Sequence, residues 1–186
     1  MTVIGITGSI ASGKTTVAQL VAKKKYPLFN ADRVVLRLYK NNSFVKLLIK
    51  KFKLNNKKNI KDQIKLLIKK NKRKLLMLES IIHPLVRKEM NNFLKRKKNF
   101  LILEIPLLIE NKLNRYFDKI IFVDAKKKIR LKRYLKQNND QRIFEMLNKR
   151  QLAPKVKKKK CDLIINNNYS LAILRKNVKQ FTDKYE

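Results

Sequence analysis

The chain has one cysteine, few acidic residues and no long apolar run. The single cysteine, Cys161, stands among 186 residues, so no internal disulfide can form. No apolar stretch approaches the roughly 20 residues that a membrane span needs. Residues 1–5 carry neither the basic region nor the cleavage site of a secretory signal. With no second cysteine and no neighbouring histidine, a metal site is not expected at Cys161. Together these absences predict a cytoplasmic protein.

The shortage of acids makes the chain strongly basic. There are 13 Asp and Glu residues against 48 Lys and Arg residues, and the formal net charge is +35. Such a field attracts polyanions, which would fit a nucleic-acid partner. The basic residues are spread along the chain rather than gathered in one arm, and Lys, Asn and Ile are abundant together. We therefore interpret the charge as compositional bias, and we expect any nucleic-acid binding to be non-specific.

The apolar pattern predicts an α/β fold with a parallel sheet. A length of 186 residues allows one sizeable core with an inserted lobe. Short apolar runs alternate with helical segments, which is typical of parallel strands joined by helices. The expected strands are residues 2–6, 26–29, 100–105, 119–123 and 163–165. The expected helices of this core are residues 13–25 and 169–184.

Two further regions are predicted to be helical and basic. Residues 34–98 carry apolar side chains at helical spacing, interrupted by asparagines and by His83-Pro84, which we expect at a helix start. Residues 126–149 form a second such region, broken near Asn138-Asn139-Asp140. The lysine run at 157–160 is predicted to be a solvated loop.

The segment from Gly8 to Thr15 matches the phosphate-binding loop pattern G-x-x-x-x-G-K-[ST] without exception. An apolar strand precedes it and a helix follows it, as this motif requires. Its backbone N–H groups and the helix N-terminus would hold phosphate oxygens. Lys14 would supply a point charge to the β- and γ-phosphates, and the Thr15 hydroxyl would ligate Mg²⁺. The predicted ATP-binding residues are Gly8, Ala11, Ser12, Gly13, Lys14, Thr15 and Thr16.

This loop alone does not choose between classes of P-loop protein. A GTPase would carry Asn-Lys-x-Asp after a late strand, whereas the nearest match, at 111–114, lacks the acid and follows the wrong strand. A P-loop kinase of a nucleotide or of another metabolite stays open, as does a basic nucleic-acid-binding ATPase.

Two acids are expected at the carboxyl ends of strands, where ligands bind in parallel sheets. Asp32 could take a proton from a substrate hydroxyl, or it could cap a helix that begins at Arg33. Glu104 could hold a Mg²⁺-bound water from the second coordination shell, or it could be an exposed residue at a strand end. Spacing leaves both choices open.

Five segments spread along nearly the whole chain form one pattern: ITGSIASGKTTV at 6–17, Asn30-Ala31-Asp32, HPLVR at 83–87, EIPLLIE at 104–110 and CDLIINNN at 161–168. In this order and spacing they resemble the dephospho-coenzyme A kinase family. The phosphate-binding loop is shared with many families, whereas the segments at 104–110 and 161–168 are more specific.

The resemblance implies transfer of the ATP γ-phosphate, with Mg²⁺, to the ribose 3′-hydroxyl of dephospho-coenzyme A. It implies one kinase domain made of a core (about 1–33, 99–125 and 161–186), a helical substrate lobe (about 34–98) and a helical lid (about 126–150). It gives Asp32 the role of general base beside Lys14. The substrate and lid candidates are His83, Arg87, Arg133 and Arg142, with Arg150 as a further lid arginine.

The chain departs from the family pattern at three places. Asn30 replaces the first acid of Asp-Ala-Asp, and Tyr169 replaces a glycine that follows the asparagine run. Gln137-Asn138 stands where the family often has Arg-Asp, so the lid arginine must come from elsewhere. None of these departures touches the phosphate-binding loop or Asp32.

Overall fold

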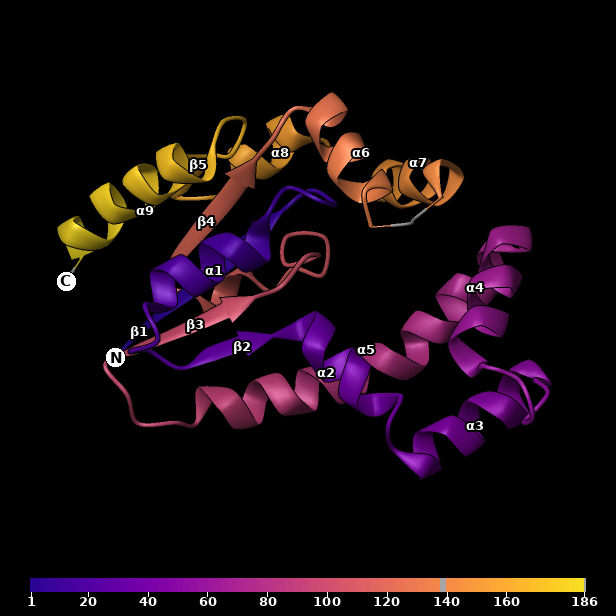
Figure 1. Cartoon of the computed structure of the whole chain (residues 1–186). Helices are drawn as coiled ribbons and strands as arrows, with labels where there is room; N and C mark the ends of the chain where they lie inside the picture. Colours follow the sequence, from indigo (N-terminus) through magenta and orange to yellow (C-terminus); the bar gives the residue numbers. More distant parts are fainter. Residues whose placement is uncertain (138–139, 186) are drawn as a thin grey trace. The chain divides into compact units, whose positions relative to one another are not determined.

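The computed structural model describes residues 1–137 and 140–185 and divides into two compact units (Figure 1). The core unit comprises Met1–Asn30 and Lys97–Glu186, and the helical unit comprises Ala31–Arg96. Within the described residues, no helix is long and apolar enough to cross a membrane.

The core unit is built on a five-stranded parallel sheet with strand order β2-β3-β1-β4-β5. Runs of Ile, Leu, Val and Phe form its central strands because side chains on both faces are buried, as parallel sheets require. The predicted α/β fold is therefore confirmed. The strands are β1 (Thr2–Gly8), β2 (Leu28–Asn30), β3 (Phe100–Glu104), β4 (Lys119–Asp124) and β5 (Leu163–Asn166).

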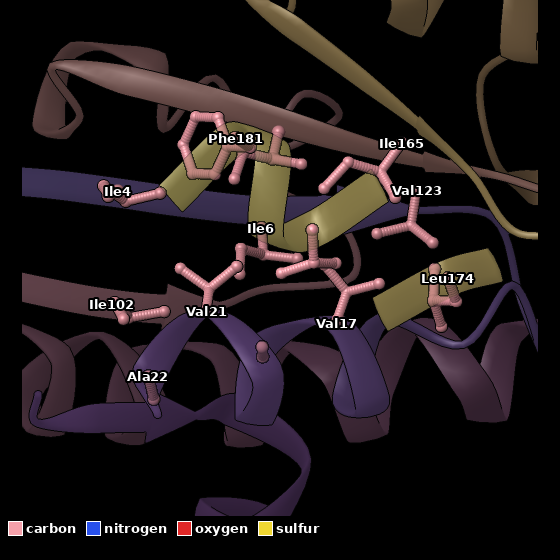
Figure 2. Close-up of a cluster of buried hydrophobic side chains, with 13 residues drawn as sticks. Ile4, Ile6, Val17, Val21, Ala22, Ile102, Val123, Ile165, Leu174 and Phe181 are labelled. Carbon is pink, nitrogen blue, oxygen red and sulfur yellow. The ribbon is translucent and has the colours of Figure 1, made fainter. Parts of the chain in front are cut away.

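One face of the sheet is covered by α1 (Lys14–Ala22) and α9 (Leu171–Tyr185), which lie against each other. Figure 2 shows Val17 and Val21 of α1 meeting Ile6 of the central strand, with Leu174 of α9 beside them. Burying each such side chain contributes about 1.5–3 kcal/mol. Helix α1 ends at Ala22 rather than near residue 25, because Lys23 has a left-handed φ of 47° and caps the helix.

The remaining segments of the core unit connect the strands. After β3 the chain makes turns and a short 3-10 helix, η1 (Asn114–Tyr116). Gly5 faces this segment, and a Cβ there would lie 2.7 Å from Leu108 and 2.9 Å from Phe117. The helices after β4 are α6 (Lys127–Leu135), α7 (Gln141–Arg150) and α8 (Pro154–Lys158). The expected break falls between α6 and α7; Asn138 and Asn139, named for it, lie outside the described residues.

The lysine run at 157–160 is not the solvated loop that the sequence predicted. Lys157 and Lys158 belong to α8, and the Lys157 side chain is completely buried. Its Nζ lies 2.9 Å from Oε1 of Glu110, which belongs to the segment after β3. The carboxylate of Glu110, whose side chain is 14% exposed, thus offsets the loss of hydration that would otherwise expel this lysine.

The helical unit consists of four helices around its own apolar cluster. Asparagines mark the helix starts: Asn41, Asn59 and Asn71 each accept a backbone N–H with the side chain. The helices are α2 (Ala31–Leu38), α3 (Asn42–Phe52), α4 (Ile60–Lys70) and α5 (Lys72–Leu94). The cluster is centred on Phe44, Leu48, Phe52, Ile64, Leu78 and Ile82.

Two predicted helix boundaries in this unit are wrong. Helix α2 begins at Ala31, so Asp32 lies within its first turn and is not the residue before the helix. His83-Pro84 lies inside α5 rather than at a helix start. Proline removes one N–H from the ladder, and the carbonyl of Ser80, four residues earlier, loses that donor. Apolar packing at Leu78 and Ile82 keeps the helix continuous through this position.

Candidate active site

The phosphate-binding loop connects the end of β1 to the start of α1, as the motif predicts. Its two glycines are required for different reasons. A Cβ on Gly8 would lie 2.6 Å from the backbone oxygen of Val123 in the neighbouring strand. Gly13 has a φ of 91°, and a Cβ there would collide with the amide of Asn167. The loop therefore needs glycine at both ends to pass between β4 and the segment after β5.

Inside the loop lie a buried lysine and a buried hydroxyl. Lys14 is 8% exposed, and its Nζ donates to the carbonyl oxygen of Ser9 at 3.0 Å. The Oγ of Ser12 is buried and has no hydrogen-bond partner among the described residues. A buried hydroxyl without a partner is uncommon, and a phosphate oxygen would satisfy it. Helix α1 begins at Lys14 with no side-chain cap, so its N-terminus is also available to an anion.

Thr15, Glu104 and Asn30 form a polar group beside the loop. The Thr15 hydroxyl donates to Oε1 of Glu104 at 2.7 Å, and the Asn30 amide donates to Oε2 of the same carboxylate. Glu104 is 1% exposed, so it is not an exposed strand-end residue. The pairing of β2, β3 and β1 brings these residues together, because Asn30 and Ile6 both lie opposite Glu104.

This polar group fits a magnesium ion. The hydroxyl of Thr15 and the carboxylate of Glu104 are hard oxygen donors, which Mg²⁺ prefers. The described residues contain no cluster of three or more His, Cys, Asp or Glu side chains that could hold a metal. Magnesium in nucleotide sites needs no such cluster, since phosphate oxygens and water complete its shell.

One predicted arginine, on α6, contacts a residue that is bonded to the loop. Arg133 on α6 donates from Nη2 to Oδ1 of Asn167 at 3.4 Å, and Asn167 donates to the Ser12 carbonyl at 2.8 Å. The Nη1 atom of Arg133 is buried with no partner in the described part of the chain, and burial lowers its pKa. Arg142 is exposed in the first turn of α7, and its backbone N–H donates to Oδ1 of Asp140.

Two residues that the sequence did not single out also reach the loop. Arg130 donates to the carbonyl oxygen of Ile10 at 3.2 Å, and Gln151 accepts the N–H of Ile10 at 2.9 Å. Burial lowers the pKa of Arg130, although Asp124 and Glu145 act in the opposite direction. Neither residue stands out in the sequence, because the contacts join positions 120 and 141 residues apart.

Three further predicted residues, Asp32, His83 and Arg87, belong to the helical unit. Asp32 is exposed in the first turn of α2. His83 and Arg87 lie one turn apart on α5 and line the same surface hollow, of about 630 Å³. Lys88 and Lys95 line it as well, so the hollow is basic.

Of the remaining predicted ATP-binding residues, Ala11 has a left-handed φ of 57° and Thr16 is half-buried in α1.

Comparison with known proteins places the chain beside one family of kinases. Residues 2–172 match the family model described as dephospho-CoA kinase. The chain is 35% identical to a dephospho-CoA kinase of Bartonella henselae over 96% of this chain and 95% of the relative.

Solved structures share the fold. A Thermus thermophilus protein, 26% identical, has a TM-score of 0.78 over 100% of this chain and 98% of its own. A dephospho-CoA kinase from Campylobacter jejuni, 23% identical, has a TM-score of 0.66 over 98% of this chain and 96% of its own.

Proposed function

Because the chain belongs to the dephospho-CoA kinase family, we propose that it transfers the γ-phosphate of ATP to the ribose 3′-hydroxyl of dephospho-coenzyme A, with Asp32 as the general base. The observation that carries this proposal is the complete phosphate-binding loop, with Lys14 inside it and the Thr15–Glu104 pair beside it. Together with the family, these groups support an ATP-dependent phosphotransferase.

The core unit supplies the ATP side of the reaction. The N–H groups of the loop and the start of α1 would hold phosphate oxygens, with the buried Ser12 hydroxyl as a further donor. Lys14 would move from the Ser9 carbonyl to the phosphates, since a charged acceptor competes well for an ammonium group. Thr15 and Glu104 would hold Mg²⁺ directly and through water. The ion would neutralise charge that develops on the transferred phosphate.

The lid supplies one further positive charge. Arg133 has a buried Nη1 atom, and its Nη2 atom donates to Asn167. Asn167 in turn donates to the backbone of the loop. We therefore favour Arg133 over Arg142 as the lid arginine, because the Arg142 side chain is exposed. A guanidinium in this position would stabilise transferring phosphate and help to exclude water.

The helical unit would supply the acceptor side. Asp32 is exposed, so its carboxylate is open to a substrate hydroxyl. The basic hollow on α5 suits a substrate that carries phosphate groups, as dephospho-coenzyme A does. His83 and Arg87 would contribute to this recognition, because both line the hollow. His83 is half-buried within a helix rather than at the helix start that the sequence suggested, and this position fits a binding role.

The role of Asp32 can be tested by Asp32→Asn with Asp62→Asn as a matched control. Both acids are exposed in the first turn of a helix, α2 and α4 respectively. Each substitution removes a charge that favours the helix dipole by about 0.3–1 kcal/mol, so stability should fall equally in the two variants. Loss of a general base should lower turnover of Asp32→Asn by about 10²–10⁴-fold, whereas Asp62→Asn should keep wild-type turnover.

Turnover is measured by coupled ADP release with dephospho-coenzyme A, and ATP affinity is measured separately by calorimetry. ATP affinity should persist in both variants, because the phosphate-binding loop is intact. A folded Asp32→Asn enzyme that turns over at the wild-type rate would show that Asp32 is not the base.

The same assay separates the rival functions. AMP and CMP in place of dephospho-coenzyme A test a nucleotide kinase, and RNA tests a nucleic-acid-stimulated ATPase. We expect dephospho-coenzyme A alone to accelerate ADP release. We expect RNA binding to be non-specific and to weaken steeply with salt, because a net charge of +35 would act through phosphate contacts. The cytoplasmic location stays part of this proposal, supported by the family and by the single cysteine.

A further inference from the structure

Ile10 lies in the phosphate-binding loop, and both of its backbone polar groups are bonded to the lid region. Its N–H donates to Oε1 of Gln151 at 2.9 Å. Its carbonyl oxygen accepts Nη1 of Arg130 at 3.2 Å. The two partners come from opposite ends of the α6–α7 hairpin: Arg130 lies within α6, and Gln151 directly follows α7. A single peptide segment of the loop is therefore held from two sides.

Arg130 is fixed in this position by contacts of its own. The residue is 3% exposed, although arginine is rarely buried. Its Nε donates to the carbonyl of Ala125 at 3.0 Å, and its Nη1 also donates to Oδ1 of Asn148 on α7 at 2.8 Å. Its guanidinium carbon lies 5.7 Å from the ring centre of the buried Phe144. These contacts give the guanidinium one orientation, so it can act as a fixed donor to Ile10.

Gln151 is anchored through the next residue. The N–H of Leu152 donates to Oε1 of Glu110 at 3.1 Å, and the same carboxylate oxygen is paired with the buried Lys157. The backbone at 151–152 is thereby tied to the segment that follows β3. The side chain of Gln151 consequently reaches Ile10 from a backbone position that these bonds fix.

The conformation that these contacts hold is one that the loop would not favour by itself. Ala11 follows Ile10 and has a φ of 57°, a left-handed conformation that residues with a Cβ disfavour. Held in this way, the peptide groups of residues 9–11 are oriented before any ligand arrives. Such preorganisation strengthens binding, since the ligand need not order the loop.

We propose that Arg130 and Gln151 are positioning residues that hold the Ile10–Ala11 segment in the form that receives phosphate, and thereby couple the α6–α7 hairpin to the occupancy of the ATP site. The proposal rests on the proposed function only in taking ATP as the ligand of this loop. Neither residue needs to touch ATP, because each acts through the backbone of Ile10.

The test measures the dissociation constant for ATP by calorimetry in Arg130→Met and Gln151→Met. Losing a neutral hydrogen bond should weaken ATP binding about threefold to tenfold in Gln151→Met, and losing a charged donor should weaken it about tenfold or more in Arg130→Met. Arg175→Met and Gln141→Met are the matched controls, because both residues are exposed on helices of the same unit. Both controls should bind ATP as the wild type does.

Three comparisons separate positioning from general stability. The double variant should weaken ATP binding by less than the product of the two single effects, because both residues hold the same peptide. The KM for ATP should rise while the KM for dephospho-coenzyme A stays unchanged, and Arg130→Lys, which keeps one charged donor, should recover part of the affinity. Wild-type ATP affinity in folded Arg130→Met and Gln151→Met would overturn the proposal, as would equal rises in both KM values.

These measurements also stay distinct from the proposed function. If the wild-type chain binds ATP and fails to phosphorylate dephospho-coenzyme A, the proposed acceptor is wrong. The ATP dissociation constants of the variants still decide the positioning role in that case. If Arg130→Met does not fold, Gln151→Met gives the decision, because Gln151 is only half-buried.

Discussion

Breaking the ion pair between Lys157 and Glu110 on one side should strongly destabilise the core unit. The Lys157 side chain is 0% exposed and the Glu110 side chain is 14% exposed, with their charged atoms 2.9 Å apart. Lys157 also donates to the carbonyl of Pro106 at 3.3 Å. Lys157→Met nearly keeps the length of the side chain. It leaves the carboxylate of Glu110, which is mostly shielded from water, without its cation. Removing one partner of a buried pair costs about 3–5 kcal/mol.

That free energy translates into a large shift in melting temperature. For a chain of this size, each kcal/mol lowers the melting temperature by about 2–4 °C, so Lys157→Met should melt about 6–20 °C lower. The control is Lys159→Met, which removes an exposed lysine of the same run and should change the free energy of unfolding by no more than about 0.5 kcal/mol. The chain has no tryptophan, so unfolding in urea and by heat is followed by far-ultraviolet circular dichroism.

A second substitution tests the electrostatic reasoning directly. Glu110→Gln removes the negative charge that Lys157→Met leaves unpaired, and it keeps an oxygen that can accept the N–H of Leu152. Lys157→Met combined with Glu110→Gln should therefore be more stable than Lys157→Met alone, because a neutral pair avoids the unpaired buried ion. If Lys157→Met loses no more stability than Lys159→Met, or if the second substitution destabilises it further, the reasoning is refuted.

Two further outcomes follow from the site and from the lone thiol. Lys14→Ala should leave the fold intact and lower turnover by about 10²–10³-fold, by analogy with the loss of one donor to transition-state charge; near-normal ADP release would refute the phosphate-binding assignment. Burial raises the pKa of Cys161 from 9.0 to about 11, outweighing the nearby Lys157. The neutral thiol is thus favoured in the folded state, so alkylation by iodoacetamide should rise with a midpoint near pH 11 in the folded chain and near 9 in urea, and folding should weaken as pH rises between these values. Equal midpoints would contradict this.

Short-range patterns in the sequence were sufficient to predict the parallel sheet and the phosphate-binding loop. Five apolar runs became five parallel strands, and the glycine, lysine and threonine positions of the loop appear in the structure between β1 and α1. Both depend on neighbouring residues: a buried strand needs consecutive apolar side chains, and the loop needs glycine where its backbone is crowded. Asn41 and Asn59 also cap helices, a role that the sequence pattern had not assigned to them, although a cap bonds only to N–H groups two or three residues away.

The sequence did not correctly predict where some residues lie within their helices. His83-Pro84 carries the chemistry of a helix start and lies in the middle of α5, whereas Asp32, one interpretation of which placed it just before a helix, lies in the first turn of α2. Pro84 is tolerated within α5 because packing at Leu78 and Ile82 outweighs one missing hydrogen bond. Local propensity predicts helix boundaries poorly where packing against distant residues stabilises the helix on both sides of the boundary.

Only the tertiary structure decided which charged residues are buried and what they hold. Four consecutive lysines look alike in the sequence, and Lys157 alone is enclosed, because Glu110, 47 positions earlier, lies where it can pair with it. Arg130 resembles the other basic residues of its helix until Ile10, Ala125 and Asn148 surround its guanidinium. The sequence by itself determined that the chain has a phosphate-binding loop on a parallel sheet. Which side chains support that loop was decided by long-range contacts, since burial and hydrogen-bond partners depend on residues that the chain brings together only when it folds.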